Sequence, residues 1–570
     1  MTSDPWGGIV TTPKLPKLLA LAVLLLPLEA AAWDLRGSSD PTKYFGIFKA
    51  AVALTGTALL AWGMLLRLRG RAGFARRLRD ALLVAVAAAA ALAWCNGFAF
   101  HQGVYVHHSD FFHHYVGAKY FRELSYVRLY DCTVVADYDA GFAFPASLRP
   151  VRRLDANRIE WATAVLADRN SCTAHFTPER WRAFQDDVTW FRSHFPPRYW
   201  ASITSDRGFN ATPAWNLAAA WLARSGPASD AQILALALVD PALLLAMWAC
   251  VAWAFGWRTL CVALLYWGTN YPAQFGWTGG SYLRQDWLAS AVVGLCLLRR
   301  GKPAAGGFAL TLATLLRMTP AVLVAGIVLK ALASAGRARS LALAPPQRRF
   351  AAGCVAALAL VLPLTALVGG GAAWPAFVRN TAVDLGTPSG NFVGWKTVVA
   401  YAHASRMSAA RDPTRIDPGA PWQEARRAVY ARRAPWFWAG VVGFLALLTR
   451  AVRRSDDWAA AVLGAGLMVI GAQIPSYYYA LLLVYAFLWP RSEAIGVGLA
   501  ALSALSWVIA GQFAERDEIF TWVSLASALF VVFATLLAGR SASSRGSGLV
   551  PGVTSAPSTR ESLHNAPTRT

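Results

Sequence analysis

Apolar residues follow one another in long blocks along this chain, separated by short polar segments. Blocks such as "FGIFKAAVALTGTALLAWGMLL" (45–66) reach the roughly 20 residues that a helix needs to cross a bilayer. The sequence therefore predicts an all-α polytopic membrane protein with about 12–14 transmembrane helices. We place them at about 16–32, 45–66, 80–99, 231–256, 259–275, 286–298, 303–316, 319–334, 350–371, 435–449, 457–474, 476–489, 494–512 and 518–538.

The first block, "LPKLLALAVLLLPLEAAAW" (15–33), lacks a small-residue cleavage site, and a second span follows closely. We interpret it as a membrane helix and not as a signal peptide. Several spans within 259–334 and 457–489 are short, which is tolerated where a helix is buried in protein or lines a cavity.

Two long polar segments interrupt the spans and are predicted to be extracytoplasmic loops with short amphipathic helices. They divide the chain into N-terminal helices (1–99), a first outer loop (100–230), a transmembrane core (231–371), a second outer loop (372–434), C-terminal helices (435–538) and a disordered cytoplasmic tail (539–570). An outer loop of about 130 residues is typical of an enzyme and unusual for a transporter.

The distribution of charge predicts which side of the membrane each loop faces. The net charge is +23, and its Lys and Arg residues gather in clusters such as the six arginines between Arg67 and Arg79. With the N-terminus inside, these clusters fall in cytoplasmic loops, as positively charged loops generally do. Both termini are then cytoplasmic, and the charge does not indicate a nucleic-acid partner.

The first outer loop contains two further structural signals. Thr177-Pro178 is a good helix start, and apolar residues follow it at helical spacing up to Phe191. This helix either lies on the membrane surface or packs as an ordinary amphipathic helix. Cys132 and Cys172 share the loop, and a disulfide between them is one of two open alternatives.

The segment "HHSDFFHHYVGAKYF" (107–121) has the densest group of polar side chains in the chain. If it is helical, His107, Asp110 and His114 share one face, with His113 beside them. Asp110 is then a candidate general base whose pKa is raised by desolvation. The alternatives are a metal site formed by His107, Asp110 and His114, which would bind a divalent cation, and a purely structural role.

Three other segments carry candidate binding groups. Arg284 and Asp286 stand at the outer end of one span, and Arg317 lies inside an apolar hairpin, where a charge is costly. In the second outer loop, Arg379, Asn391 and Lys396 are candidates for phosphate or sugar hydroxyls. The tyrosines of "QIPSYYYALLL" (473–483), Tyr478 among them, form either an aromatic belt or a sugar-stacking wall.

Three of these segments together resemble the type C glycosyltransferases, the multi-helix enzymes that use polyprenyl-phosphate sugars. The resemblance is nearest to the bacterial α-mannosyltransferase branch. It rests on "SDFFHHYVGAKYFRELSYVRLYD" (109–131), "RQDWLASAVVGLCLLRRGKPAAGGFALTLATLLRMTP" (284–320) and "SGNFVGWKTVVAY" (389–401).

The resemblance implies an inner (plasma) membrane hexosyltransferase of the cell envelope. It would move a hexose, mannose among the candidates, from a polyprenyl-phosphate donor to a glycan, lipid or protein acceptor outside the membrane. We expect no cofactor, with a divalent metal ion as the alternative. Asp110 would be the catalytic aspartate. The groups that would hold or orient the donor are His107, His113, His114, Arg284, Asp286, Arg317, Asn391, Lys396 and Tyr478.

Two other classes of function remain as alternatives. One is a transporter or flippase for a lipid-linked glycan, which would need charged residues deep in several spans. The other is a membrane metalloenzyme built on the cluster from His107 to His114. The chain has no Gly-rich phosphate loop, nucleophile elbow, CxxC or zincin motif, so cytosolic nucleotide-dependent chemistry is not supported.

Overall fold

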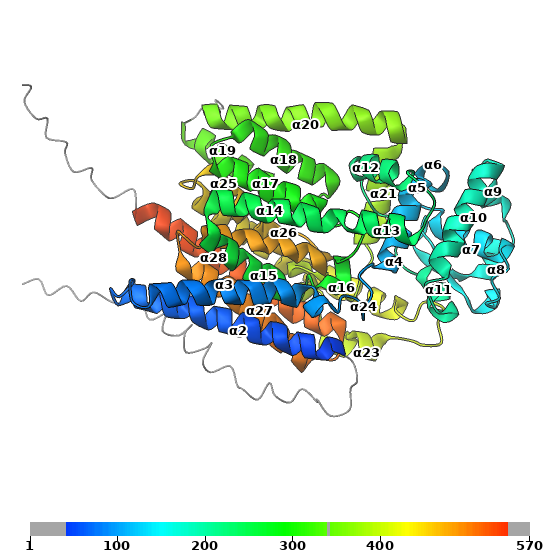
Figure 1. Ribbon diagram of the computed structural model, residues 1–570, viewed down its shortest axis with the longest axis horizontal. Helices are drawn as coiled ribbons and strands as arrows, with labels where there is room; N and C mark the ends of the chain where they lie inside the picture. Colours follow the sequence, from blue (N-terminus) through cyan, green and yellow to red (C-terminus); the bar gives the residue numbers. More distant parts are fainter. Residues whose placement is uncertain (1–40, 339–342, 545–570) are drawn as a thin grey trace, which may run out of the picture.

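The computed structural model describes residues 41–338 and 343–544. Within these ranges the protein is mostly helical, and long helices lie side by side along its long axis (Figure 1). Six helices are long and apolar enough to cross a membrane: Phe45–Leu68, Asp230–Phe255, Pro345–Gly369, Ala420–Val452, Glu493–Gln512 and Arg516–Arg540. The predicted helical architecture is thus present. Among the described residues six helices could cross a membrane by length and composition, against about 12–14 predicted, and the predicted first span at 16–32 lies outside the described residues.

The helices of the bundle have the following bounds: α2 Pro41–Leu68, α3 Arg76–Trp94, α13 Asp230–Ala237, α14 Val239–Phe255, α15 Trp257–Thr269, α17 Asp286–Arg299, α18 Pro303–Leu316, α19 Ala321–Ala338, α20 Pro345–Gly369, α24 Ala420–Val452, α25 Asp457–Gly464, α26 Gly466–Gly471, η6 Ser476–Leu488, α27 Glu493–Gln512 and α28 Arg516–Ser544. Each predicted span from residue 45 onward coincides with one of these helices or with a consecutive pair. Most bounds agree with the prediction to within about six residues, and the largest difference is at the start of α24.

The helix α24 begins at Ala420, well before the predicted span start at 435, and it continues through Pro435. The polar residues of its first turns hid this start in the hydropathy pattern. At the other end of the chain, α28 extends to Ser544, so residues 539–544 are helical and not part of a disordered tail. The rest of the predicted tail, 545–570, lies outside the described residues.

Close helix contacts hold the bundle together. The helix α18 packs against α17 and α20, α15 packs against α3, and α2 packs against α27. Glycines permit the closest of these contacts: a Cβ at Gly307 would meet the carbonyl of Phe350, and one at Gly353 would meet that of Ala304. Small residues commonly allow such approach between membrane helices.

The first outer segment folds around a hydrophobic core of its own at one end of the bundle, where α7 to α11 gather (Figure 1). Its elements are η2 Asn96–Phe98, α4 His108–Phe111, η3 Phe112–Val116, α5 Gly117–Lys119, α6 Phe121–Leu124, α7 Leu129–Asp139, η4 Ala146–Leu148, β1 Pro150–Arg153, β2 Arg158–Trp161, α8 Ala162–Leu166, α9 Asn170–Thr173, α10 Pro178–Arg192, α11 Pro197–Ile203 and α12 Pro213–Ala223. The strands β1 and β2 pair antiparallel, with Val151 opposite Glu160.

The predicted amphipathic helix is α10, and Thr177 caps it by accepting a hydrogen bond from the backbone N–H of Arg180. Its apolar residues Phe184, Val188 and Phe191 are buried in the core of the outer segment. The ordinary packed-helix interpretation is therefore correct, because the apolar face points into protein. Cys132 and Cys172 form a disulfide, with their Cα atoms 5.2 Å apart.

The second outer segment is shorter and packs back onto the end of the bundle. It contains α21 Ala373–Leu385, β3 Phe392–Val393, α22 Trp395–Val399, η5 His403–Ser405 and α23 Met407–Ala410. The strand β3 pairs antiparallel with β4, Ile474–Pro475, which precedes η6. A short helix between α15 and α17, α16 Phe275–Thr278, completes this end of the bundle.

Candidate functional site

The histidine-rich segment begins where the chain leaves the bundle after α3. His107 caps α4: its Nδ1 accepts a hydrogen bond of 3.2 Å from the backbone N–H of Asp110. The helix then widens into a π-helical turn, η3, which contains His113 and His114. Such turns occur often at functional sites because the extra residue redirects the side chains that follow.

A glycine lets this segment dock against the loop before α17. Gly280 has φ +62°, and a Cβ there would meet the carbonyl oxygen of Tyr105. Its own carbonyl accepts a hydrogen bond of 2.9 Å from the backbone N–H of His107. The close approach brings Asp110 to the loop that carries Arg284.

The carboxylate of Asp110 lies between a cation and an imidazole. Its Oδ1 is 3.5 Å from Nε of Arg284, and its Oδ2 is 3.6 Å from Nδ1 of His114. The side chain is only 12% exposed. Among the residues that the structure describes, Oδ2 has no hydrogen-bond partner, so this buried oxygen is free to accept a proton or a hydrogen bond from a ligand.

The charge state of Asp110 differs from the sequence-based expectation. Burial acts to raise its pKa and is the largest single influence, as expected from desolvation, but the positive charge of Arg284 and the neighbouring His114, His107 and His113 together outweigh it. The pKa of Asp110 is therefore held below its ordinary value, and the expected upward shift is wrong. The sequence could not reveal this sign, because the decisive cation comes from a distant segment.

The two histidines nearest Asp110 are held in defined orientations. Nε2 of His114 accepts a hydrogen bond of 2.9 Å from Nη1 of Arg284, and its Nδ1 lies 3.1 Å from the backbone carbonyl oxygen of Asp110. Burial lowers the pKa of His114 to about 3, so its ring is neutral at pH 7. His107 is likewise engaged at both nitrogens, since its Nε2 lies 3.1 Å from the carbonyl oxygen of Gly276.

These contacts argue against the metal-site alternative of His107, Asp110 and His114. A histidine ligand needs a ring nitrogen with a free lone pair, and in both histidines one nitrogen accepts a hydrogen bond while the other donates. Across residues 41–338 and 343–544, no group of three or more His, Cys, Asp or Glu side chains is arranged to hold a metal ion.

A cavity of about 850 Å³ opens in front of Asp110, between the two outer segments. Six of the predicted site residues line it: His107, Asp110, His113, His114, Arg284 and Asn391. His113 reaches it with its Nδ1 3.2 Å from the hydroxyl of Tyr130 and its Nε2 3.4 Å from Oδ2 of Asp206. The cavity thus joins residues from all three segments that carry the family resemblance.

The other four predicted residues do not line this cavity. Asp286 accepts a hydrogen bond of 2.7 Å from the backbone N–H of Trp287, and the ring of Tyr478 lies tilted against the ring of Trp287, with their centres 5.3 Å apart. Lys396 lies over the ring of Tyr430, 4.6 Å from its centre. Arg317 is buried beside Trp215, and its Nη2 has no hydrogen-bond partner among the described residues.

Tyr477, and not its neighbour Tyr478, faces the cavity, and the guanidinium of Arg284 lies 5.0 Å from the centre of its ring. Of the three consecutive tyrosines predicted as a possible sugar-stacking wall, Tyr477 alone is among the residues that line the cavity in the described part of the chain. A planar aromatic ring next to a cation suits a sugar face and fixes the guanidinium by a cation–π contact.

Several lining residues were not found from the sequence. Arg207 joins the two outer segments: it pairs with Asp384 at 2.5 Å and donates to the carbonyl oxygens of Thr387 and Pro388. Further charged groups at the cavity are Asp206, Arg411, Glu515 and Arg516. They lie in polar segments without a distinctive motif, so no local signal separated them from ordinary surface charges.

Asp240 is a positioning residue that a local signal could have identified. It is the one carboxylate inside the apolar run of α14, where a charge is costly. Its oxygens accept the backbone N–H groups of Arg284 at 2.8 Å and Gln285 at 3.2 Å. Just before them, Leu283 adopts φ +49°, a strained conformation for leucine. Asp240 thereby fixes the turn from which Arg284 reaches Asp110.

No protein-family model, no curated protein and no solved structure matches this chain. The functional argument therefore rests on the geometry of the site and on the residues themselves.

Proposed function

We propose that this protein is a type C glycosyltransferase that moves a hexose from a polyprenyl-phosphate donor to an acceptor outside the membrane. One observation carries the proposal: the ionised side chain of Asp110 lines a cavity of about 850 Å³, and its buried Oδ2 has no hydrogen-bond partner among the described residues. The cavity lies at the end of the helix bundle, and we propose that the lipid-linked sugar enters it there.

In the proposed reaction Asp110 is the general base. The acceptor hydroxyl gives its proton to Oδ2 of Asp110 while its oxygen forms a bond to C1 of the sugar. The bond between C1 and the phosphate oxygen breaks, and its electron pair stays on the departing polyprenyl phosphate. Positioned base catalysis of this kind typically contributes about 10²–10⁴-fold to a rate.

Arg284 supplies the cation for the departing phosphate, because its guanidinium already faces the cavity. Fixed cations at developing negative charge are among the largest contributions to catalysis. A donor phosphate beside Arg284 also offsets the field that lowers the pKa of Asp110. Donor binding therefore makes Asp110 a stronger base at the moment when a base is required.

Two features support an extracytoplasmic site. The disulfide between Cys132 and Cys172 belongs to the segment that forms one wall of the cavity, and disulfides persist in oxidising compartments. The basic turn from Arg67 to Arg79 lies at the opposite end of α3 from this segment, as the preference of positive charge for the cytoplasmic side requires. We therefore assign the protein to the plasma membrane, with about 12–14 spans and cytoplasmic termini.

The test is complementation of a gene deletion. The deletion should remove one sugar from a cell-envelope glycan, and mannose is the first sugar to quantify. The wild-type gene and Asp131→Asn should restore it, whereas Asp110→Asn should not. Asp131 is a matched control because it is a buried carboxylate of the same outer segment, paired with Arg153 at 3.2 Å and away from the cavity.

Restoration of the glycan by Asp110→Asn, with membrane levels equal to wild type, would refute the proposal. Accumulation of the complete glycan on the cytoplasmic side in the deletion strain would instead identify a flippase. A transferase leaves the glycan one sugar short wherever it is found.

A further inference from the structure

A second cavity lies at the other end of the helix bundle from Asp110. It has a volume of about 310 Å³ and is enclosed by α2, α3, α15 and the start of α27. The helix α15 runs between the two cavities. It begins at Arg258's end beside the second cavity, and the chain after its other end reaches Gly276, which lines the cavity at Asp110. The proposed transferase reaction makes no use of it.

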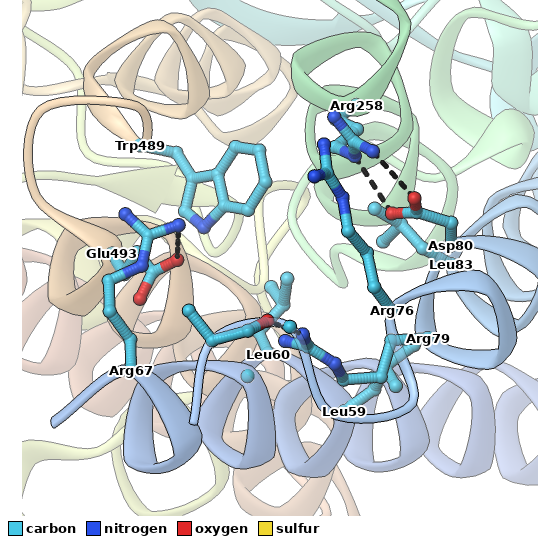
Figure 2. Close-up of a pocket in the computed structure, with 13 residues that line it drawn as sticks. Leu59, Leu60, Arg67, Arg76, Arg79, Asp80, Leu83, Arg258, Trp489 and Glu493 are labelled. Carbon is cyan, nitrogen blue, oxygen red and sulfur yellow. Dashed lines mark hydrogen bonds and ion pairs between the residues drawn. The ribbon is translucent and has the colours of Figure 1, made fainter. Parts of the chain in front are cut away.

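Arginines dominate the charged lining of this second cavity. Arg67, Arg76, Arg79 and Arg258 face two carboxylates, Asp80 and Glu493. Figure 2 shows Arg67 with Glu493 on one side of the space and Arg258 with Asp80 on the other. The lining therefore has two more positive than negative groups.

The two carboxylates are already engaged, which identifies the uncompensated cations. Arg67 pairs with Glu493 at 2.9 Å, and Nε of Arg258 donates to Asp80 at 2.8 Å. Arg79 donates to the backbone carbonyl oxygens of Phe74 and Ala72. Among the described residues, no carboxylate forms an ion pair with Arg76 or Arg79, so their charges remain available to an anion.

The remaining walls are apolar. Leu59, Leu60, Leu83 and the indole of Trp489 line the space between the arginines (Figure 2). The turn that carries the arginines also exposes large apolar side chains: Leu68 is 67% exposed and Phe74 59% exposed. Arginines beside exposed leucine and phenylalanine at the end of apolar helices match the interface between headgroups and acyl chains.

We propose that this cavity binds the phosphate of an anionic membrane lipid, with the glycerol and upper acyl chains against the leucines and Trp489. Guanidinium groups bind phosphate oxygens in bidentate fashion, and basic pockets between membrane helices are suited to anionic headgroups. The excess of two arginines is more than enough to neutralise one lipid phosphodiester, which carries a single negative charge. The same chemistry would accept soluble phosphate, so the experiment separates the two sources.

The experiment is lipid retention measured by native mass spectrometry. The intact protein is reconstituted in phosphatidylglycerol or in phosphatidylcholine, extracted in mild detergent, and scored for bound lipid. Wild type should retain phosphatidylglycerol and not phosphatidylcholine. Arg76→Gln should reduce this retention by about fivefold, the effect of one basic residue near an anionic headgroup. Arg76 has no ion pair whose loss would disturb the fold.

Arg77→Gln is the matched control, because Arg77 is the next residue on α3, is exposed and does not line the cavity. It should retain phosphatidylglycerol as wild type does. If both variants lose phosphatidylglycerol equally, the lipid is attracted by the general positive charge of the surface, and the proposed binding site is refuted. Displacement of the lipid by inorganic phosphate, together with thermal stabilisation by phosphate alone, would overturn the lipid as its ligand.

Discussion

Nη1 of Arg284 donates a hydrogen bond of 2.9 Å to Nε2 of His114, a residue 170 positions away in the chain. Because an arginine only donates, this contact requires an unprotonated Nε2 on His114. The same guanidinium lies 3.5 Å from the carboxylate of Asp110. One side chain therefore sets both the tautomer of the histidine and the charge of the candidate base.

Replacing Arg284 should change both the rate and the pH dependence of transfer. Arg284→Gln removes the cation that lowers the pKa of Asp110, so that pKa rises and the acidic limb of kcat/KM moves to higher pH. The loss of a fixed cation at the phosphate should also reduce kcat by about 100-fold or more. Arg284→Lys should keep the acidic limb near its original pH and still lose rate, since lysine cannot reproduce the paired geometry. An unmoved limb in Arg284→Gln would contradict the electrostatic role.

The wild-type enzyme should show two different acidic limbs. The profile of kcat/KM reports the free enzyme, and the profile of kcat reports the donor complex. The anionic donor offsets Arg284, so the pKa of Asp110 is higher in the complex than in the free protein. The limb in kcat should therefore lie at higher pH than the limb in kcat/KM. Coincident limbs would show that the donor phosphate does not approach Arg284.

Stability should fall as the pH drops below about 6.5, because buried imidazoles must take up protons on unfolding. Burial lowers the pKa of His101 to about 4 and that of His114 to about 3, from an ordinary value of 6.5. In that interval the unfolded chain binds more protons, so the folded state loses stability as the pH falls. Each fully buried imidazole contributes up to about 1.4 kcal/mol per pH unit.

Thermal unfolding followed by tryptophan fluorescence measures this slope. His101→Gln should flatten it, because glutamine does not titrate there and can replace the ring nitrogen that lies 2.9 Å from the carbonyl oxygen of Gly279. His403→Gln is the control, since the side chain of His403 is 75% exposed. A slope left unchanged by His101→Gln would assign the effect to other groups.

Asp240→Asn should weaken the site without touching the cavity. An asparagine offers one acceptor where Asp240 offers two, so one of the backbone N–H groups of Arg284 and Gln285 becomes unsatisfied. We expect a loss of about 1–3 kcal/mol in stability. We also expect a lower kcat, and we expect the acidic limb of the kcat/KM profile to move to higher pH, as in Arg284→Gln. A purely structural role would lower the melting temperature and leave the limb in place.

Removing the disulfide should destabilise the outer segment more than it affects chemistry. Cys132 and Cys172 are 40 residues apart, and bridges over loops of this length typically contribute about 2–4 kcal/mol. The double change to serine should lower the melting temperature and abolish its sensitivity to reductant. The other five cysteines are free thiols, so reductant acts on one bond alone. Retained kcat is expected because neither cysteine lines the cavity.

Much of the fold could be predicted because it is encoded locally. Runs of apolar residues specify membrane helices, and each predicted span within the described ranges is helical. The start of α24 was missed because its first turns, from Ala420 onward, are polar although helical. The packing of α10 was left open because an amphipathic pattern alone does not say whether membrane or protein covers the apolar face.

The sequence by itself predicted the helical bundle and the two long segments between its helices, and it singled out Asp110 as a candidate base, since each follows from the composition of a short stretch. Only the tertiary structure decided the pairing of Asp110 with Arg284, the direction of its pKa shift, the bridge from Arg207 to Asp384 and the partner of Cys132. The physical reason is that charge and hydrogen-bond interactions depend on distance in space, and these partners come from segments far apart in the chain.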